Sequence, residues 1–126
     1  MTAINVLLDS SLWVDYFLNG STESKSYIES GNYNLFTSSI SLHEIKKRLL
    51  KEKYTSNSIN QSLDFIKSKS IISDITEKIC EQSAEDAVKL KLNTADALIY
   101  RTAQNQNALL VTLDYDFKGL KNTRVI

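Results

Sequence analysis

Four acidic side chains stand where elements of secondary structure are expected to begin or end. Asp9 and Asp114 each follow an apolar run, and Glu44 and Asp96 fall in the first turns of two expected helices. Two carboxylates about 5 Å apart repel each other by roughly 3 kcal/mol at an effective dielectric constant near 20, so a cluster of four would partly protonate or bind a cation. Oxygen ligands without histidine or cysteine favour Mg²⁺ or Mn²⁺ over zinc. One or two such ions can activate a water and stabilise a phosphoryl transition state, which is the chemistry of metal-dependent phosphodiester cleavage.

Each acid also has a purely structural explanation. Ser41 and Glu44 fit an S-x-x-E capping box, in which the glutamate bonds back to the backbone amide of the cap. After a cap at Thr94, Asp96 would be stabilised by the positive end of a helix dipole. The remaining acids fit as a helix cap or as turn residues: Asp9, Asp114 and Asp116. Because all four principal acids fall at element edges expected on one rim of the fold, we favour a shared site.

Short strands alternate with helices along the chain. Strands are expected at residues 4–8, 33–38, 70–73, 108–112 and 123–126. Helices are expected from residue 10 to before Gly20, and at 22–30, 41–54, 58–68, 77–90 and 94–104. This alternation predicts an α/β sandwich around a mostly parallel sheet. In such folds, ligands bind beyond the carboxyl ends of the strands.

The composition of the chain indicates one soluble domain over residues 1–126. Fifteen basic and fifteen acidic side chains cancel, so binding of a polyanion must depend on a local patch. The single cysteine, Cys80, excludes an internal disulfide and suits a reducing compartment. No signal peptide is recognisable and no apolar run approaches 18 residues, so we expect a cytoplasmic protein that does not enter a membrane.

Four stretches resemble, in order and spacing, the acidic motifs of PIN-domain ribonucleases. They are LLDSSLWVDYF, ISLHEIKKRL, TADALIYRTA and LLVTLDYDF. The resemblance spans essentially the whole chain, and its length and order are most similar to the VapC toxins of VapBC type II toxin–antitoxin systems. It implies a PIN-like α/β/α sandwich with a mostly parallel central sheet of four to five strands.

The resemblance also implies roles for individual residues. Metal binding and catalysis fall on Asp9, Glu44, Asp96 and Asp114, of which Asp9 and Asp96 are expected to be the principal ligands. Supporting roles fall on Ser10, Ser11, Thr112 and Asp116. The implied activity is that of a Mg²⁺- or Mn²⁺-dependent endoribonuclease in which a metal-activated water attacks an RNA phosphodiester. The implied partners are the RNA substrate, a cognate antitoxin protein and a second copy of the chain in a homodimer.

Candidate contacts to RNA lie mainly on the expected helix at 41–54. They are Lys46, Lys47, Arg48 and, on a later helix, Arg101. Neutralising phosphates supplies most of the affinity for nucleic acid, although a basic run on an amphipathic helix is also typical of a solvated face. Leu113 and Tyr115 stand where relatives often carry basic residues, which argues against a phosphate contact from the last acidic loop.

Two other kinds of domain also gather acids at strand ends around Mg²⁺. A metal-dependent ligand-binding module needs D-x-S-x-S after the first strand; Asp9 and Ser11 fit, but Trp13 occupies the third position. A receiver-like signalling domain should carry an acidic pair after its first strand and a lysine ending its last one. Here Ser10 follows Asp9, and the terminal TRVI has no lysine. Both alternatives therefore fit the sequence less well than a nuclease.

Overall fold

A computed structural model describes residues 3–126 and contains a five-stranded sheet. The strands are β1 (Ile4–Leu8), β2 (Tyr33–Ser38), β3 (Ile71–Ser73), β4 (Leu109–Thr112) and β5 (Thr123–Val125). The helices are α1 (Ser10–Leu18), α2 (Thr22–Ile28), α3 (Ser39–Lys51), α4 (Ser56–Lys69), α5 (Glu77–Leu90), α6 (Thr94–Asn105) and the 3₁₀ helix η1 (Tyr115–Phe117). All neighbouring strands pair in parallel, so the predicted mostly parallel α/β sandwich is confirmed.

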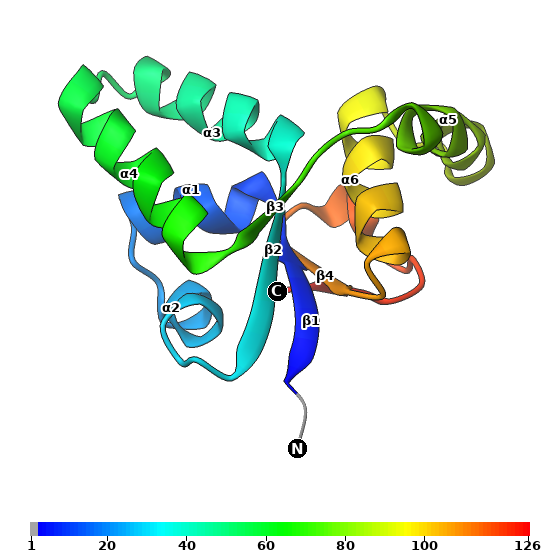
Figure 1. The fold of residues 1–126 in the computed structure, drawn as a ribbon, viewed down its shortest axis with the longest axis horizontal. Coiled ribbons are helices and arrows are strands. Elements are labelled where there is room, and N and C mark those ends of the chain that lie inside the picture. The colour runs from blue at the N-terminus through cyan, green and yellow to red at the C-terminus, as the bar shows by residue number, and fades with distance from the viewer. Residues whose placement is uncertain (1–2) are drawn as a thin grey trace.

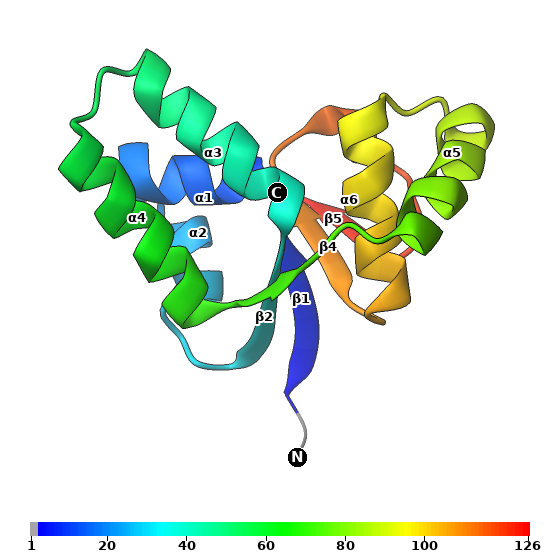
Figure 2. The same cartoon turned by 45° about the horizontal axis from the view of Figure 1, so that its top comes forward.

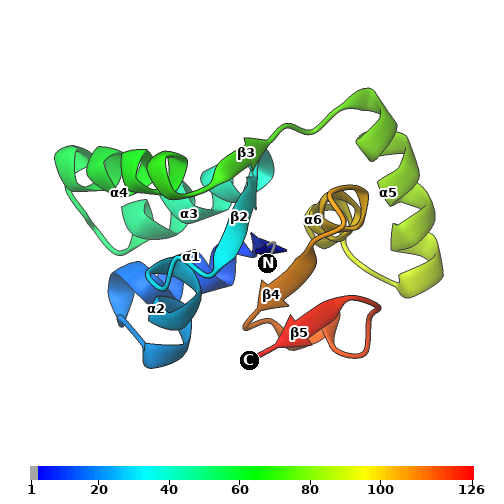
Figure 3. The same ribbon diagram turned by 60° about the horizontal axis from the view of Figure 1, so that its bottom comes forward.

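Helices cover both faces of this sheet, with α1 to α4 on one side and α5 and α6 on the other (Figures 1 and 3). Side chains along a strand point alternately to the two faces. On the first face, the strand side chains that pack with α1 to α4 are Val6, Leu8, Leu35 and Val111. On the opposite face, those that pack with α6 and η1 are Leu7, Phe36 and Leu110. Parallel strands buried on both faces need continuous apolar sequence, which explains runs such as VLL and LLV.

The strand order is β3-β2-β1-β4-β5, so the direction of the chain across the sheet reverses beside β1. From β1 the chain moves outward through β2 to β3, and it then returns to place β4 on the other side of β1. At such a switch point, the connections leave the carboxyl ends of two adjacent strands toward opposite faces and open a crevice between them. Asp9 follows β1 directly, and Asp114 follows β4 after one intervening residue. The topology therefore brings the first and last predicted acids to one crevice.

Two local expectations about helix starts are wrong. The N-cap of α3 is Ser38, and Ser41 lies inside the helix, fully buried and without a hydrogen-bond partner for its hydroxyl. Glu44 therefore belongs to the second turn, and the capping box does not form. The cap of α6 is Asn93 rather than Thr94, because the Asn93 side chain accepts a hydrogen bond from the Asp96 amide at 2.8 Å.

Within residues 3–126, no helix has both the length and the apolar character needed to cross a membrane.

Candidate metal centre

Asp9 sits in the crevice at the end of β1 and is 4% exposed. Its backbone amide donates to the Val111 carbonyl at 3.0 Å, which extends the pairing of β1 with β4 by one residue. Its Oδ2 atom accepts hydrogen bonds from the Ser11 hydroxyl at 2.8 Å and the Thr112 hydroxyl at 2.7 Å. Although Asp9 occupies the N-cap position of α1, its side chain makes no cap hydrogen bond. The predicted cap position of Asp9 is thus confirmed, but two hydroxyls of the crevice fix its carboxylate, which takes no part in capping the helix.

The loop after β4 is tied to the same two hydroxyls. The Leu113 amide donates to Ser11 Oγ at 3.0 Å, and the Asp114 amide donates to Thr112 Oγ1 at 2.9 Å. Asp114 then caps η1 by accepting from the Asp116 amide at 2.9 Å. Each hydroxyl thus donates to the Asp9 carboxylate and accepts a backbone amide of the loop. The hydroxyls therefore fix the position of Asp9, after β1, relative to Asp114, after β4.

The N-terminus of α6 delivers a third acid, Asp96, to this loop. Figure 2 shows the first turn of α6 beside the segment that follows β4. Asp96 is 8% exposed, and one carboxylate oxygen each from Asp96, Asp114 and Asp116 lies within 4.8 Å of the others. Among residues 3–126, these three side chains form the one group of three or more potential metal ligands that lie this close together. Asp116, predicted as a supporting acid, therefore lies with two of the predicted ligands.

The pKa of Asp96 is raised by its burial and by the neighbouring carboxylates. Burial, followed by the charges of four other carboxylates, raises that pKa from 3.8 to about 7. The four carboxylates, from the largest effect to the smallest, belong to Asp114, Asp9, Glu44 and Asp116. All five acids thus share one electrostatic site, although Asp9 and Glu44 are not part of the 4.8 Å group.

Glu44 reaches the site from α3. Its side chain is half-buried, and its Oε1 atom is buried without a hydrogen-bond partner. Burial, and then the charge of Asp9, raise the pKa of Glu44, while Ser10, His43 and Lys47 oppose this shift. Burying a carboxylate oxygen without a hydrogen-bond donor costs free energy. A bound cation, or a water coordinated to that cation, would supply the missing partner of Glu44 Oε1. Ser10 thus lies beside Glu44, whereas Ser11 binds Asp9.

The donor set fits a hard divalent cation. All the candidate ligand atoms are carboxylate oxygens, which Mg²⁺ and Mn²⁺ prefer. A bound cation would offset both the burial and the carboxylate repulsion that raise the pKa of Asp96, and it would provide a partner for the Glu44 oxygen. Mg²⁺ usually keeps several waters and binds only one or two carboxylates directly. Some of the five acids can therefore act on the ion through its bound waters.

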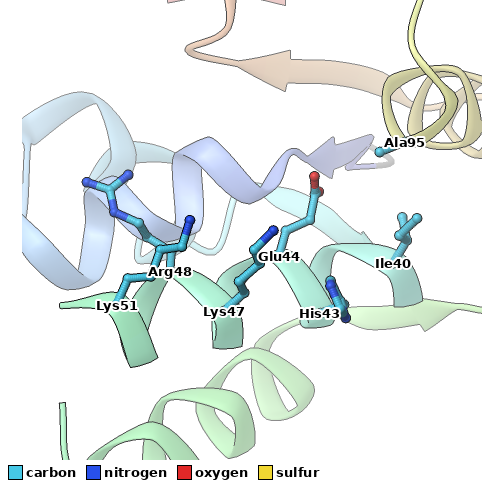
Figure 4. Close-up of a pocket in the computed structure, with 7 residues that line it drawn as sticks. All are labelled: Ile40, His43, Glu44, Lys47, Arg48, Lys51 and Ala95. Atoms are coloured by element: carbon cyan, nitrogen blue, oxygen red, sulfur yellow. The ribbon is translucent and has the colours of Figure 1, made fainter. Parts of the chain in front are cut away.

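A groove runs from this site along α3 (Figure 4). Its basic lining side chains, Lys47, Arg48 and Lys51, recur on one face of the helix with Glu44, at the spacing of successive turns. In the figure, Glu44 and Lys47 extend to the same side of α3, with Ala95 of α6 across the gap. Lys46 is exposed but does not line this groove. Only some basic residues of this helix therefore face the groove beside the acids.

Comparison with known families decides the classification of the chain. Residues 6–122 match the PIN domain family. The chain belongs to the PIN domain family. The predicted membership and the predicted PIN-like sandwich are therefore both confirmed.

Solved structures similar to this PIN domain include toxin–antitoxin proteins. A toxin–antitoxin complex from Klebsiella pneumoniae is similar with a TM-score of 0.80 and 26% identity, over 95% of this chain and 96% of that chain. VapBC2 from Rickettsia felis, bound to a promoter DNA fragment, has a TM-score of 0.78 and 23% identity, over 98% of both chains. VapC20 from Mycobacterium tuberculosis, a toxin that cleaves the Sarcin-Ricin loop, has a TM-score of 0.73 and 16% identity, over 94% and 98%. Among curated protein sequences, none matches the chain significantly.

Arg101 of this PIN domain is engaged away from the acids. Its Nε and one terminal nitrogen donate to the two carboxylate oxygens of Asp86, both at 2.7 Å, and the pair joins α6 to α5. The hydrogen bonds and charge of Asp86 raise the pKa of Arg101, while burial opposes the shift. This paired guanidinium argues against the predicted role of Arg101 in RNA contact.

Proposed function

We propose that this PIN domain is a Mg²⁺- or Mn²⁺-dependent endoribonuclease and the toxin of a toxin–antitoxin pair. The observation that carries the proposal is the carboxylate group formed by Asp96, Asp114 and Asp116, with ligand atoms within 4.8 Å of one another. Asp9 and Glu44 act on the same group through their charges. The similar structures include toxin–antitoxin complexes and a toxin that cleaves the Sarcin-Ricin loop, which supports RNA as the substrate and an antitoxin as the partner.

The proposed roles follow from where each acid is held. Asp96 and Asp114 would hold the ion with Asp9, which the hydroxyls of Ser11 and Thr112 keep in place. Glu44 completes the predicted set, and its Oε1 atom is buried without a hydrogen-bond partner. Asp116 joins the set through its place in the 4.8 Å group. When bound, a divalent ion lowers the pKa of a coordinated water and stabilises charge on the phosphate. The expected products of in-line hydrolysis are a 3′-hydroxyl and a 5′-phosphate.

The groove along α3 is the proposed path of the RNA backbone. Lys47, Arg48 and Lys51 lie on its wall and can neutralise successive phosphates. Arg48 also pairs with Glu52 at 3.1 Å, but both side chains are about half exposed, so a phosphate can compete with this weak pair. Because the net charge of the chain is zero, this local basic face supplies the attraction that the whole molecule lacks.

The proposed biological setting follows from the toxin assignment. An antitoxin segment lying in the active-site groove would block access to the acids, and a homodimer is the proposed assembly. Since the substrate is cellular RNA, the proposed location is the cytoplasm.

The test is cleavage of structured RNA by purified protein in the presence of Mg²⁺ or Mn²⁺. Asp9→Asn and Asp96→Asn keep the size of each side chain and remove its charge, so both should abolish most of the metal-dependent cleavage. Asp64→Asn is the matched control, because Asp64 is an exposed acid on α4 that does not belong to the group of acids. It should cleave like wild type.

Binding of the ion is measured separately, as the rise in thermal midpoint when Mn²⁺ is added to metal-free protein. Wild type and Asp64→Asn should show this rise, and Asp96→Asn should lose most of it. Absence of metal-dependent cleavage by wild type, or undiminished cleavage by both site variants, would disprove the nuclease proposal.

A further inference from the structure

Tyr115 stands between the two acids of the last loop and is 72% exposed. Its neighbours have clear structural or chemical roles: Asp114 and Asp116 belong to the group of acids, and Phe117 is fully buried in the core. The Tyr115 ring contributes little to that core. A large aromatic ring exposed on the loop that carries two acids of the site is therefore a feature that the fold does not explain.

The loop that presents this ring is held firmly. The amides of residues 113, 114 and 116 bond to side-chain oxygens of Ser11, Thr112 and Asp114. The amides of residues 117 and 118 donate to the backbone carbonyls of Asp114 and Tyr115, and the Phe117 side chain anchors the turn. An aromatic side chain on such a support loses little conformational freedom when it binds a ligand, since its backbone is already ordered.

A cation accompanies the ring. Lys118 Nζ lies 5.3 Å from the centroid of Tyr115, in the range of a cation–π contact. Lys118 is itself exposed and bonds no carboxylate at ion-pair distance in the described part of the chain. An aromatic face next to a free ammonium offers a stacking surface for a base and a contact for the adjoining phosphate.

The charge around the loop favours stacking over further ionic contacts. From residue 113 to 117 the loop reads LDYDF and has no basic side chain, so its two acids repel a phosphate backbone until a cation is bound. Stacking of a neutral base on an aromatic ring does not depend on this charge. Leu113, 36% exposed on the other side of Asp114, adds apolar surface that continues into a groove with Val14 and Leu18.

We propose that Tyr115, with Lys118, forms a nucleotide subsite in which an unpaired base of single-stranded RNA stacks on the Tyr115 ring beside the carboxylate group. The inference rests on the proposed function for the identity of the ligand as RNA. It adds a residue that selects the substrate: the nucleotide beside the scissile phosphate must be unpaired, and bases that stack strongly are favoured there.

Steady-state cleavage of single-stranded RNA in Mg²⁺ tests this subsite. Tyr115→Ala should raise KM about tenfold, the effect of losing one base–aromatic stack, and leave kcat nearly unchanged. Tyr115→Phe keeps the ring and should behave like wild type. Val88→Ala is the control, because Val88 on α5 is also a largely exposed apolar residue, 83% exposed and outside the loop. The preference among bases at the stacked position should weaken in Tyr115→Ala alone.

A binding experiment separates the subsite from the nuclease activity. With Mg²⁺ present and Asp96→Asn as the background that prevents cleavage, single-stranded RNA should quench the indole fluorescence of Tyr115→Trp, while the native Trp13 is fully buried and serves as a constant signal. An oligomer of the same length whose nucleotides lack bases should quench much less. Quenching without cleavage by wild type would disprove the nuclease proposal and support the subsite.

Three results would overturn the subsite. One is equal quenching by the oligomer without bases, and another is an unchanged KM in Tyr115→Ala while wild type cleaves RNA. The third is a Tyr115→Ala protein that binds RNA normally but changes its sedimentation, because the ring would then be a contact between protein chains.

Discussion

The Thr112 hydroxyl donates to Asp9 Oδ2 at 2.7 Å, although 103 positions separate the two residues in the sequence. Parallel pairing of β1 with β4 places them at adjacent strand ends, and Thr112 is fully buried there. The same oxygen of Thr112 accepts the Asp114 amide at 2.9 Å. One hydroxyl therefore sets the relation between the carboxylate after β1 and the loop that carries the next two acids.

Replacing this hydroxyl should impair the site more than the fold. Thr112→Val keeps the shape of the side chain, but it removes a donor to Asp9 and leaves the Asp114 amide without its acceptor. Loss of a hydrogen bond that orients a metal ligand typically costs about 10- to 100-fold in metal affinity or activity, and we expect a loss in this range. The measurement is Mn²⁺ affinity by calorimetry together with the rate of RNA cleavage.

Thr102→Val is the matched control for Thr112→Val. Thr102 is also fully buried, but its hydroxyl donates to the Leu98 carbonyl within α6, away from the acids. It should retain the metal affinity of wild type. Equal losses in the two variants would mean that buried threonine hydroxyls act through general stability and that Thr112 has no special role.

The sheet and its rim were predictable because they follow from strong local signals. Apolar runs at 4–8 and near 109–112 can be buried only as inner strands, and a parallel sheet brings their carboxyl ends to one edge. That reasoning places Asp9 and Asp114 in one crevice without any knowledge of their contacts. Assignment of metal ligation to them stays a prediction.

Other features depend on tertiary contacts that leave no local pattern. The serines at 38, 39 and 41 could each cap a helix, and which one does so depends on where β2 ends. Asp116 joins Asp96 only because Asp114 caps η1 and Phe117 is buried beneath it. Arg101 pairs with Asp86 on another helix, 15 positions away, so no local pattern in the sequence predicts this partner.

The stability of the metal-free protein should fall as the pH rises toward neutrality. In the folded state the pKa of Asp96 is raised from 3.8 to about 7. Between these values the folded protein keeps a proton that the unfolded chain has lost, so the free energy of unfolding decreases with pH and levels off above 7. The raised pKa of Glu44 contributes a slope of the same sign.

Urea denaturation in EDTA at several pH values measures this slope, and Asp96→Asn identifies its source. The variant cannot titrate at position 96, so its stability should decline less between pH 3.8 and 7. Asp15 contributes the opposite sign at lower pH, because hydrogen bonds from Ser21, Ser24 and Asn19 lower its pKa despite a smaller effect of burial. The comparison of wild type with the variant removes that contribution. Identical slopes in the two proteins would contradict the assignment.

Replacing each of two adjacent lysines of α3 should change the affinity for RNA by different amounts. Lys47 lines the groove beside Glu44, whereas Lys46 is exposed outside it. If Lys47 neutralises one phosphate, Lys47→Ala should weaken binding and reduce the slope of log affinity against log salt by about 0.7, the value for one contact on a single strand. Lys46→Ala, which makes the same change in net charge, should have little effect on either quantity.

Fluorescence anisotropy of labelled RNA at several salt concentrations supplies the measurement for both lysine variants. Asp96→Asn should be the background for all proteins in this comparison, so that cleavage does not consume the RNA. Equal reductions in slope for Lys46→Ala and Lys47→Ala would show that RNA responds to net charge alone and does not follow the groove.

The Asp86–Arg101 pair should matter for stability far more than the exposed pair on α3. The side chains of Arg101 and Asp86 are 26% and 9% exposed, against 52% and 43% for Arg48 and Glu52. Asp86→Ala leaves a largely buried guanidinium without its carboxylate, which should cost about 3 kcal/mol in the free energy of unfolding. Glu52→Ala breaks the exposed pair and should cost about 0.5 kcal/mol.

A double variant separates the need for charge from the need for packing at this position. Asp86→Leu with Arg101→Met replaces the pair by apolar side chains of similar size, and such replacements are often neutral or stabilising. We expect the double variant to unfold in urea near the wild-type midpoint and to keep its RNA cleavage, because neither residue belongs to the group of acids at the crevice. Restored stability with lost cleavage would instead mean that Arg101 contacts the substrate and that its bond to Asp86 is exchanged when RNA binds.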